Sequence, residues 1–319
     1  AAHPLDDGNT ACLYPSLEQT AAALGADKDQ YLQLLQPLVN AWPEMIGDIL
    51  APLKFPAHPM HMARFGWQAL RSADHLAKRF IGEPVKALVA GMAAHGMQPL
   101  EAPATASFAL VLMIAGHSQG WPIPVGGSTS IARAMGDYFI SLGGKIETGI
   151  YVKSLAQLPA TKAVLFDTTP KQLMAIAGQS LSAFYQWQLK RFRYGMGVFK
   201  VDWALDAPIP FSDDACREAG TVHLGNRYAD IAGSERATAQ GHHPDQPFVL
   251  LAQQSLFDTT RAPAGKQVAW GYCHVPNGST KDMTHAIESQ VERFAPGFRE
   301  RIIGRHSMNT SEMEIYNPN

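Results

Sequence analysis

A pair of glycines ahead of an amphipathic stretch is the part of this sequence best suited to approach a ligand. Gly126 and Gly127 lack a Cβ, so a bound molecule could lie against the backbone there, and Ser128 follows them. The spacing of the next apolar residues predicts a core-packed helix between hydroxyl residues 128–130 and Gly143. Its apolar face comprises Ile131, Met135, Tyr138, Phe139 and Leu142. Paired glycines more commonly only turn the chain, so this pattern leaves both interpretations open.

A second motif has the spacing of a hydrolase nucleophile. Residues 116–120 read Gly-His-Ser-Gln-Gly and follow the apolar run 108–115, which could be the strand before a nucleophile elbow. A helix must begin directly after that serine to direct its N–H groups at an oxyanion, and the prolines in 121–124 disfavour one. No Asp and His stand out downstream as partners for Ser118. We interpret the motif as a turn and keep an α/β-hydrolase as the weaker alternative.

Two buried strands are expected after the predicted helix. Ile146, Ile150 and Val152 suit the first, and residues 163–166 suit the second, which ends in the turn 167–170. Together with the glycines and the helix they would form one compact unit.

This order of segments resembles FAD-dependent oxidoreductases of the phytoene desaturase and amine oxidase group. The resemblance rests on the glycine pair, the helix, and the segment 143–155, and it is nearest to the phytoene-dehydrogenase-related branch. It extends over most of the chain, through the runs 121–124, 194–203, 255–266 and 272–279.

The resemblance implies that the segment 121–170 contacts FAD, with the backbone of Val152 beside the adenine end. The cofactor-contacting residues would be Gly126, Gly127, Ser128, Val152 and Thr168. Such enzymes hold the pyrophosphate at a Gly-x-Gly-x-x-Gly turn that begins a helix, and this sequence contains no such turn. We therefore expect the interior of a larger flavoprotein, which by itself binds FAD weakly or not at all.

The composition indicates a globular protein. The chain has 319 residues, 46% of them hydrophobic, which is enough for a sizeable core. A net charge of -2 and scattered Lys and Arg argue against nucleic acid as a partner. Cys12, Cys216 and Cys273 lack paired spacing, so we expect free thiols and a cytoplasmic location.

Contact with a membrane surface remains open. The apolar run 108–116 is far shorter than the roughly 20 residues that span a bilayer. The segment 34–71 interleaves large apolar residues with few acids, and could rest on a lipid surface as a peripheral patch. Helices that cover the substrate domain are the favoured interpretation of the same residues. A homodimer also remains open.

Three parts follow one another without linkers or repeats. Residues 1–120 would be a helical cover, begun by a capping box at Asp27 and Gln30 and cut into short pieces by prolines. Residues 121–170 would be the FAD-proximal segment, and residues 171–319 the substrate-binding sheet domain. Strands are expected at 197–205, 221–224, 248–253 and 268–274, followed by a helix over 280–294 that begins with a Ser279–Asp282 capping box and packs through Met283, Ile287, Val291 and Phe294. This indicates an α+β fold, related to α/β, with helices on one face of a largely antiparallel sheet.

The remaining polar residues give weaker signals. His58 and His61, like His242 and His243, lack a second ligand pair at zinc spacing, so we interpret them as surface or packing histidines and assign no metal. On strand 197–205 the two-residue period puts Lys200 and Asp202 on one face and Phe199, Val201 and Trp203 on the other. Candidates to line a substrate cavity are Trp121, Tyr194, Trp203 and Tyr272.

The sequence thus predicts the substrate-binding and flavin-adjacent part of an FAD-dependent oxidoreductase. Its substrate would be a large apolar molecule, such as a polyene or an isoprenoid. The flavin would carry the chemistry, so no catalytic acid or base is assigned. The alternative from another class is a catalytically silent binding or assembly module that keeps the flavoprotein fold.

Overall fold

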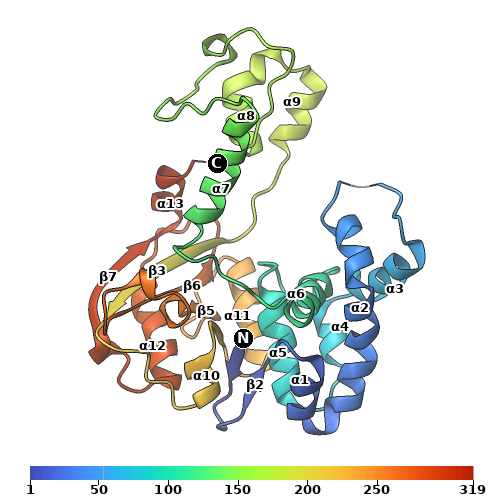
Figure 1. Cartoon of the computed structure of the whole chain (residues 1–319), viewed down its shortest axis with the longest axis vertical. Coiled ribbons are helices and arrows are strands. Elements are labelled where there is room, and N and C mark those ends of the chain that lie inside the picture. Colours follow the sequence, from blue (N-terminus) through green and yellow to red (C-terminus); the bar gives the residue numbers. More distant parts are fainter. Residues whose placement is uncertain (53, 319) are drawn as a thin grey trace.

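The computed structural model describes residues 1–52 and 54–318. Its N-terminal third is mainly helical and forms the first of two hydrophobic cores (Figure 1). The helices of this part are α1 (Leu17–Ala23), α2 (Lys28–Ile49), α3 (Pro59–Ala69), α4 (Ala73–Ala77), α5 (Glu83–Ala94) and α6 (Ala106–Ser118), with a 3-10 turn at Gly25–Asp27.

Helix α2 is longer than the sequence predicted. It continues through Pro37 and Pro43, which were expected to end it, because Leu34, Leu35 and Leu38 are buried in the core and packing offsets the lost backbone hydrogen bonds. The capping box at its start is not formed. Asp27 instead accepts hydrogen bonds from the backbone N–H groups of Ile81 and Gly82, at 2.8 and 2.6 Å.

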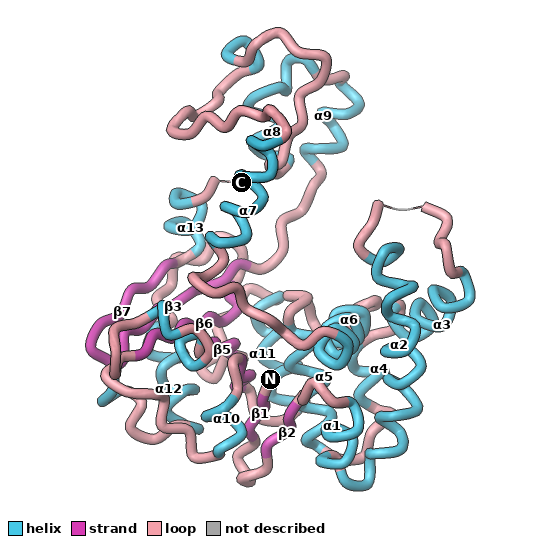
Figure 2. Tube along the Cα trace, viewed as in Figure 1, coloured by secondary structure: helices cyan, strands magenta, loops and turns pink. Residues whose placement is uncertain are grey.

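A seven-stranded sheet in the order β2-β1-β4-β5-β6-β3-β7 runs from the N-terminal helices to the left edge of the molecule in Figure 2. The β1–β4 pair is parallel and all the other pairs are antiparallel, which confirms the predicted α+β class. The strands are β1 (Ala2–Pro4), β2 (Thr10–Cys12), β3 (Gly197–Leu205), β4 (Thr221–Leu224), β5 (Val249–Ala252), β6 (Gln267–Val275) and β7 (Ile302–Met308). The sequence predicted β3 to β6 at these places but missed β1, β2 and β7.

Helices pack on both faces of this sheet, not on one as the sequence indicated. Helix α12 (Thr284–Phe294) covers the face that carries Val201 and Trp203, and together they form the second core. Helices α5 and α11 (Tyr228–Ala239) cover part of the opposite face, where α5 contacts β1 and α11 contacts β6. The C-terminal helices are α10 (Asp214–Glu218), α11 (Tyr228–Ala239), α12 (Thr284–Phe294) and α13 (Thr310–Tyr316), with 3-10 turns at Gln254–Leu256, Thr259–Arg261 and Arg299–Arg301.

Helix α12 confirms its predicted inner face. Met283, Ile287, Val291 and Phe294 are all buried. The helix starts at Thr284, later than expected, and the Ser279–Asp282 capping box is absent, since Asp282 accepts a hydrogen bond from the N–H of Thr284.

Residues 122–194 form a lobe that projects from the rest of the molecule, seen above the sheet in Figure 1. It contains α7 (Thr129–Ser141), α8 (Pro170–Ala177) and α9 (Ala183–Lys190), with 3-10 turns at Leu155–Gln157 and Gly178–Ser180. Among its described residues, only Ala177 and Gly178 are buried.

The lobe corrects three predictions. Helix α7 forms as expected, but its apolar face is exposed, with Met135 and Leu142 at 68% and 69%. Residues 144–153 and 163–166 are not strands, and Ile150 and Leu165 are exposed. A strand needs a neighbour for its backbone hydrogen bonds, and the described residues of this chain supply none here.

Candidate functional site

The glycine turn at Gly126 and Gly127 is held by a segment far away in the sequence. The N–H of Gly126 donates to a carboxylate oxygen of Asp258 at 2.7 Å, and Arg261 donates to the carbonyl oxygen of Gly126 at 3.0 Å. Hydrogen bonds from Thr260, and then from the Gly126 N–H, lower the pKa of Asp258. Hydrogen bonds with Asp258 and Arg261 therefore fix the conformation of the turn at the base of the lobe.

Both glycines have left-handed backbones, with φ of +82° at Gly126 and +88° at Gly127, which favours glycine over other residues. A Cβ on Gly127 would lie 2.5 Å from the Arg261 guanidinium. A bulkier residue at 127 would therefore strain the fold by itself, in addition to any effect on a ligand.

The other predicted cofactor residues lie farther along the lobe. Ser128 is exposed at the start of α7 and makes no side-chain cap, Val152 is half-buried in a loop, and Thr168 is exposed just before α8. The structure brings Thr168 close to the predicted substrate residue Tyr194, because the Tyr194 hydroxyl donates to the hydroxyl of the next residue, Thr169, at 2.9 Å.

One face of the sheet presents aromatic and charged side chains. Tyr272 lies opposite Lys200 in the β3–β6 register, and its ring is stacked on Trp270 at a centroid distance of 6.1 Å. Burial raises the pKa of Tyr272 to about 12. Lys200 pairs with Asp202 at 2.6 Å, as the strand period predicted.

Trp203 does not join this group. Its side chain lies on the opposite face of the sheet and is 1% exposed, its N–H donates to Glu288 at 3.1 Å, and its ring packs edge-on against Phe298. The prediction that Trp203 lines a substrate cavity is therefore wrong, because its side chain is part of the second core.

A row of histidines crosses the covered part of the aromatic face. Nε2 of His95, at the end of α5, lies 3.1 Å from Nε2 of His223 on β4. The His223 ring stands edge-on to His3 on β1, and Nε2 of His3 lies 2.7 Å from the carbonyl oxygen of Asn226. Trp121, a predicted substrate residue, stands edge-on to His95 at a centroid distance of 6.4 Å.

The same face carries a buried carboxylate–histidine pair. Glu235 of α11 lies 2.8 Å from Nδ1 of His274, and both side chains are almost fully buried. The His274 ring packs against Tyr272. Burial lowers the pKa of His95 to about 4, with a smaller contribution from His274.

Sequence reasoning missed this set of buried groups. The histidines come from β1, α5, β4 and β6, so no local spacing connects them. The available signal was the alternation on the strands, which puts His223 and His274 on the face opposite the core residues Val222 and Cys273.

The serine motif at 116–120, the histidine pair and the cysteines occupy positions in the fold that indicate no catalytic site. Ser118 is the last residue of α6, not part of a turn, and the run 108–115 is helical, which removes the strand that a nucleophile elbow requires. His58 and His61 lie at the surface beside Glu44, as expected. The three cysteines, Cys12, Cys216 and Cys273, are free, as predicted, and buried.

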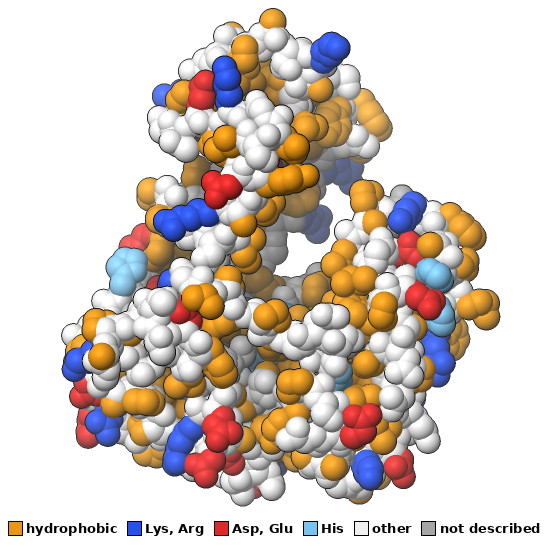
Figure 3. Space-filling model, viewed as in Figure 1, with side chains coloured by type: hydrophobic (Ala, Val, Ile, Leu, Met, Phe, Trp, Pro, Cys, Tyr) orange, Lys and Arg blue, Asp and Glu red, His pale blue; other side chains and the backbone are white. Residues whose placement is uncertain are grey.

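An opening separates the lobe from the body, and hydrophobic side chains line its rim (Figure 3). None of the helices in the described residues is long and apolar enough to cross a membrane.

Comparisons with known proteins give the fold. No family model matches the chain, and no curated protein matches it in sequence. A solved oxidoreductase from Methanosarcina mazei is similar in structure, with a TM-score of 0.54, 16% identity and coverage of 76% of this chain and 57% of that one. A putrescine oxidase bound to putrescine is also similar, with a TM-score of 0.53, 12% identity and coverage of 97% and 66%.

The chain thus has the fold of these oxidoreductases and spans less than two thirds of each. Identity this low supports the fold only.

Proposed function

We propose that this chain is the substrate-binding and flavin-adjacent part of an FAD-dependent oxidoreductase that dehydrogenates a large apolar substrate, such as a polyene or an isoprenoid. The observation that carries the proposal is the glycine turn, held by Asp258 and Arg261 at the base of an apolar lobe. The resemblance of its flanking runs to phytoene-dehydrogenase-related proteins supports the same assignment.

The residues at this turn suit an anionic dinucleotide. Arg261 is exposed, and its guanidinium donates to the Gly126 carbonyl oxygen and helps to lower the pKa of the nearby Asp258 carboxyl, so it places a positive charge at the turn that a phosphate would also contact. At the start of α7 the N–H groups of Ser130 and Ile131 donate to the carbonyl oxygens of Gly127 and Ser128, so among the described residues of this first turn only the N–H groups of Ser128 and Thr129 are left for an anion. Gly126, Gly127, Ser128, Val152 and Thr168 would hold the cofactor.

In this proposal the flavin carries out the oxidation, and the residues of this chain hold the substrate. When bound, the flavin accepts a hydride equivalent from a C–H bond. Trp121, Tyr194 and Tyr272 would orient an apolar molecule and exclude water from it. The apolar face of α7 would pack against a cofactor-binding segment supplied from outside this sequence, since contiguous exposed apolar patches usually mark an interface.

Location and further contacts are also proposals. Three free, buried thiols suit the cytoplasm. The tip of α2 and α3 exposes apolar residues beside basic ones, which suits peripheral contact with an anionic membrane. These are Leu50, Phe55, Met60, Trp67 and Leu70, with Lys54, Arg64 and Arg71. The exposed face of α7 would also suit a homodimer.

An absorbance spectrum tests the proposed function. The longest natural chain that contains this sequence should carry flavin bands after purification. Arg261→Gln should lower the flavin bound per chain, whereas Arg133→Gln, which removes an exposed cation from α7, should not. A protein without flavin, and without a response to added FAD, would favour the silent module.

Titration of the 319-residue chain with FAD tests the effect of lacking a Gly-x-Gly-x-x-Gly turn. We expect weak binding or none, because this sequence lacks the turn that normally supplies the pyrophosphate donors. Tight stoichiometric binding would contradict that expectation.

A further inference from the structure

The histidine row has one consistent arrangement of protons, set at its inner end. A carbonyl oxygen only accepts hydrogen bonds, so Nε2 of His3, which lies 2.7 Å from the Asn226 carbonyl oxygen, carries the proton. Nδ1 of His3 is then a bare acceptor. Among the described residues this buried atom has no partner.

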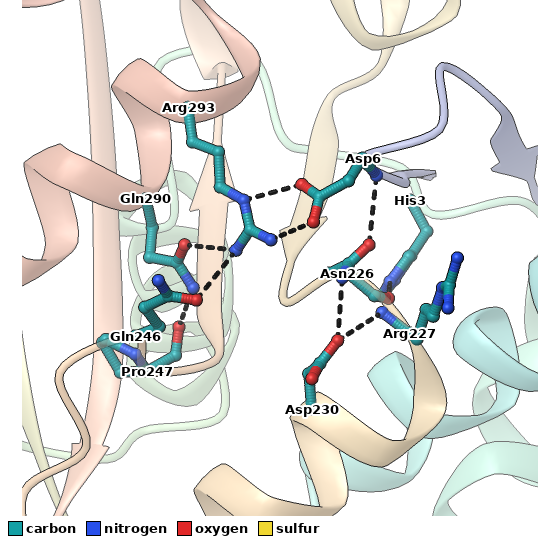
Figure 4. Close-up of polar contacts among 9 residues, drawn as sticks. All are labelled: His3, Asp6, Asn226, Arg227, Asp230, Gln246, Pro247, Gln290 and Arg293. Carbon is teal, nitrogen blue, oxygen red and sulfur yellow. Dashed lines mark hydrogen bonds and ion pairs between the residues drawn. The ribbon is translucent and has the colours of Figure 1, made fainter.

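The Asn226 carbonyl is held firmly in place (Figure 4). The Asn226 side chain accepts from the N–H of Asp6 at 3.0 Å and donates to Asp230 at 2.8 Å. Its backbone is in the left-handed region, with φ of +61°, which non-glycine residues seldom adopt. Asp6 is fixed in turn by Arg293 at 2.7 Å. The anchor of the row is therefore preorganised.

His223 lies in the middle of the row, and the proton position of His3 determines its tautomer. Nδ1 of His223 is also buried without a partner among the described residues. The Nδ1 atoms of His223 and His3 lie 2.7 and 3.0 Å from the point where a Cβ on Gly91 would be, so both face the same small space. Because neither Nδ1 has a partner among the described residues, two bare lone pairs facing this space would repel each other, so with Nδ1 of His3 bare the favourable neutral form of His223 carries its proton on Nδ1.

The outer end follows from the same reasoning. A neutral His223 that is protonated on Nδ1 has a bare Nε2, which must accept from His95 across 3.1 Å. His95 therefore carries its proton on Nε2 and leaves Nδ1 bare. Among the described residues that Nδ1 has no hydrogen-bond partner, and His95 is half-buried beside Trp121.

We propose that Nδ1 of His95 is the hydrogen-bond acceptor of the ligand site and binds an O–H or N–H donor on an otherwise apolar molecule, with His223 and His3 as positioning residues that fix its tautomer. The choice of an apolar ligand rests on the proposed function. The tautomer rests on the geometry alone.

Nuclear magnetic resonance tests the tautomer without any ligand. Long-range 1H–15N spectra of the 15N-labelled chain near neutral pH should show His95, assigned with His95→Phe, protonated only on Nε2. His3→Gln should convert this signal into a mixture of tautomers, and His285→Gln, at an exposed histidine on α12, should leave it unchanged. A wild-type His95 that is protonated on Nδ1 would overturn the proposal.

Binding of matched isoprenoids tests the acceptor role. Farnesol and farnesylamine each carry a donor, and farnesyl methyl ether has the same apolar chain without one. We expect the better donor to bind wild-type protein about tenfold more tightly than the ether, the value of one net hydrogen bond. His95→Phe should bind all three alike. The tighter of the two donors identifies the group as hydroxyl or amine.

The outcomes separate this inference from the proposed function. Equal binding of donors and ether to wild-type protein would overturn the role of His95 and leave the apolar substrate standing. Absence of binding for all three compounds would overturn both the ligand site and the apolar substrate class.

Discussion

Helices α7 and α12 carry the same apolar spacing in opposite surroundings. Ile287 and Val291 of α12 are completely buried against the sheet, whereas Met135 of α7 and Leu142 directly after it are more than two-thirds exposed. The apolar face of each helix predicts that the helix packs against another part of the protein. The spacing of the apolar residues does not identify that part. Amphipathic spacing therefore identifies a helix face that is suited to packing. It does not show whether the packing partner lies in the same stretch of chain.

The difference extends to the regions around the two helices. The body contains two hydrophobic cores, and the lobe contributes no described residue to either of their buried clusters. The lobe is connected to the body by the Gly126 turn and by ordered contacts with Asp258 and Arg261. The buried hydrophobic clusters of the described residues therefore lie in the body, and the lobe packs against them only at its base.

The largest expected effect is a difference in the free energy of unfolding when one apolar side chain is shortened on α12 and one on α7. Ile287→Ala should lower the free energy of unfolding by about 3 kcal/mol, because it opens a cavity in a packed core. Ile131→Ala on α7 should change it by less than about 0.5 kcal/mol. Denaturant titration of both variants of the 319-residue chain measures the contrast. An equal cost at Ile131 that grows with protein concentration would mean that a second copy covers α7.

The next effect is a pH dependence that belongs to the body. Burial lowers the pKa of His3 from 6.5 to about 4. The unfolded state then binds a proton that the native state does not, so the stability is intact above pH 6.5 and falls as the pH drops toward 4. Between pH 7 and pH 5 the loss from His3 should be about 2 kcal/mol.

Denaturant titrations at both pH values check this expectation. His3→Gln should reduce the loss between pH 7 and pH 5 by about this amount and leave the part that comes from His95 and His223, whose pKa values burial also lowers, and His285→Gln on the surface should retain the whole loss. An unchanged slope in His3→Gln would mean that His3 does not titrate differently on unfolding.

A smaller effect should distinguish two helical glycines. A Cβ on Gly91 would lie 2.7 Å from Nδ1 of the buried His223, whereas a Cβ on Gly66 would meet nothing within 4 Å. Gly91→Ala should therefore destabilise the protein by about 1–2 kcal/mol through overpacking, and Gly66→Ala should stabilise it by up to about 1 kcal/mol through helix propensity. Thermal unfolding measures both, and a stabilising Gly91→Ala would show that the space around the histidines is open.

The smallest effect should be that of Ser118→Ala. The Ser118 hydroxyl is buried at the end of α6 without a partner among the described residues, so its removal should change stability by less than about 0.5 kcal/mol. Any activity of the full protein should persist. Loss of an esterase activity by orders of magnitude would restore the hydrolase alternative, because removal of a nucleophile has that effect.

Local patterns in the sequence determined strands β3 to β6 and helix α12. The two-residue period of β3 assigned Lys200 and Val201 to opposite faces, and the helical spacing of α12 assigned Ile287 and Val291 to the core. These predictions succeeded because each element packs along its whole length, so its own residues report its environment. The glycine pair was likewise evident as a turn, since both residues adopt positive φ.

Only the tertiary structure decided the rest. Residues 144–153 have a strand-like composition but form no strand, because backbone pairing requires a neighbour that the described chain does not place there. Helix α2 passes through Pro37 because buried leucines hold it, a contribution that helix propensity does not contain. The histidine row joins β1, α5 and β4 across more than 200 residues of sequence, and its proton arrangement depends on the Asn226 carbonyl. Side-chain type and spacing are local properties, whereas burial, hydrogen-bond partners and tautomers are properties of what the fold brings into contact.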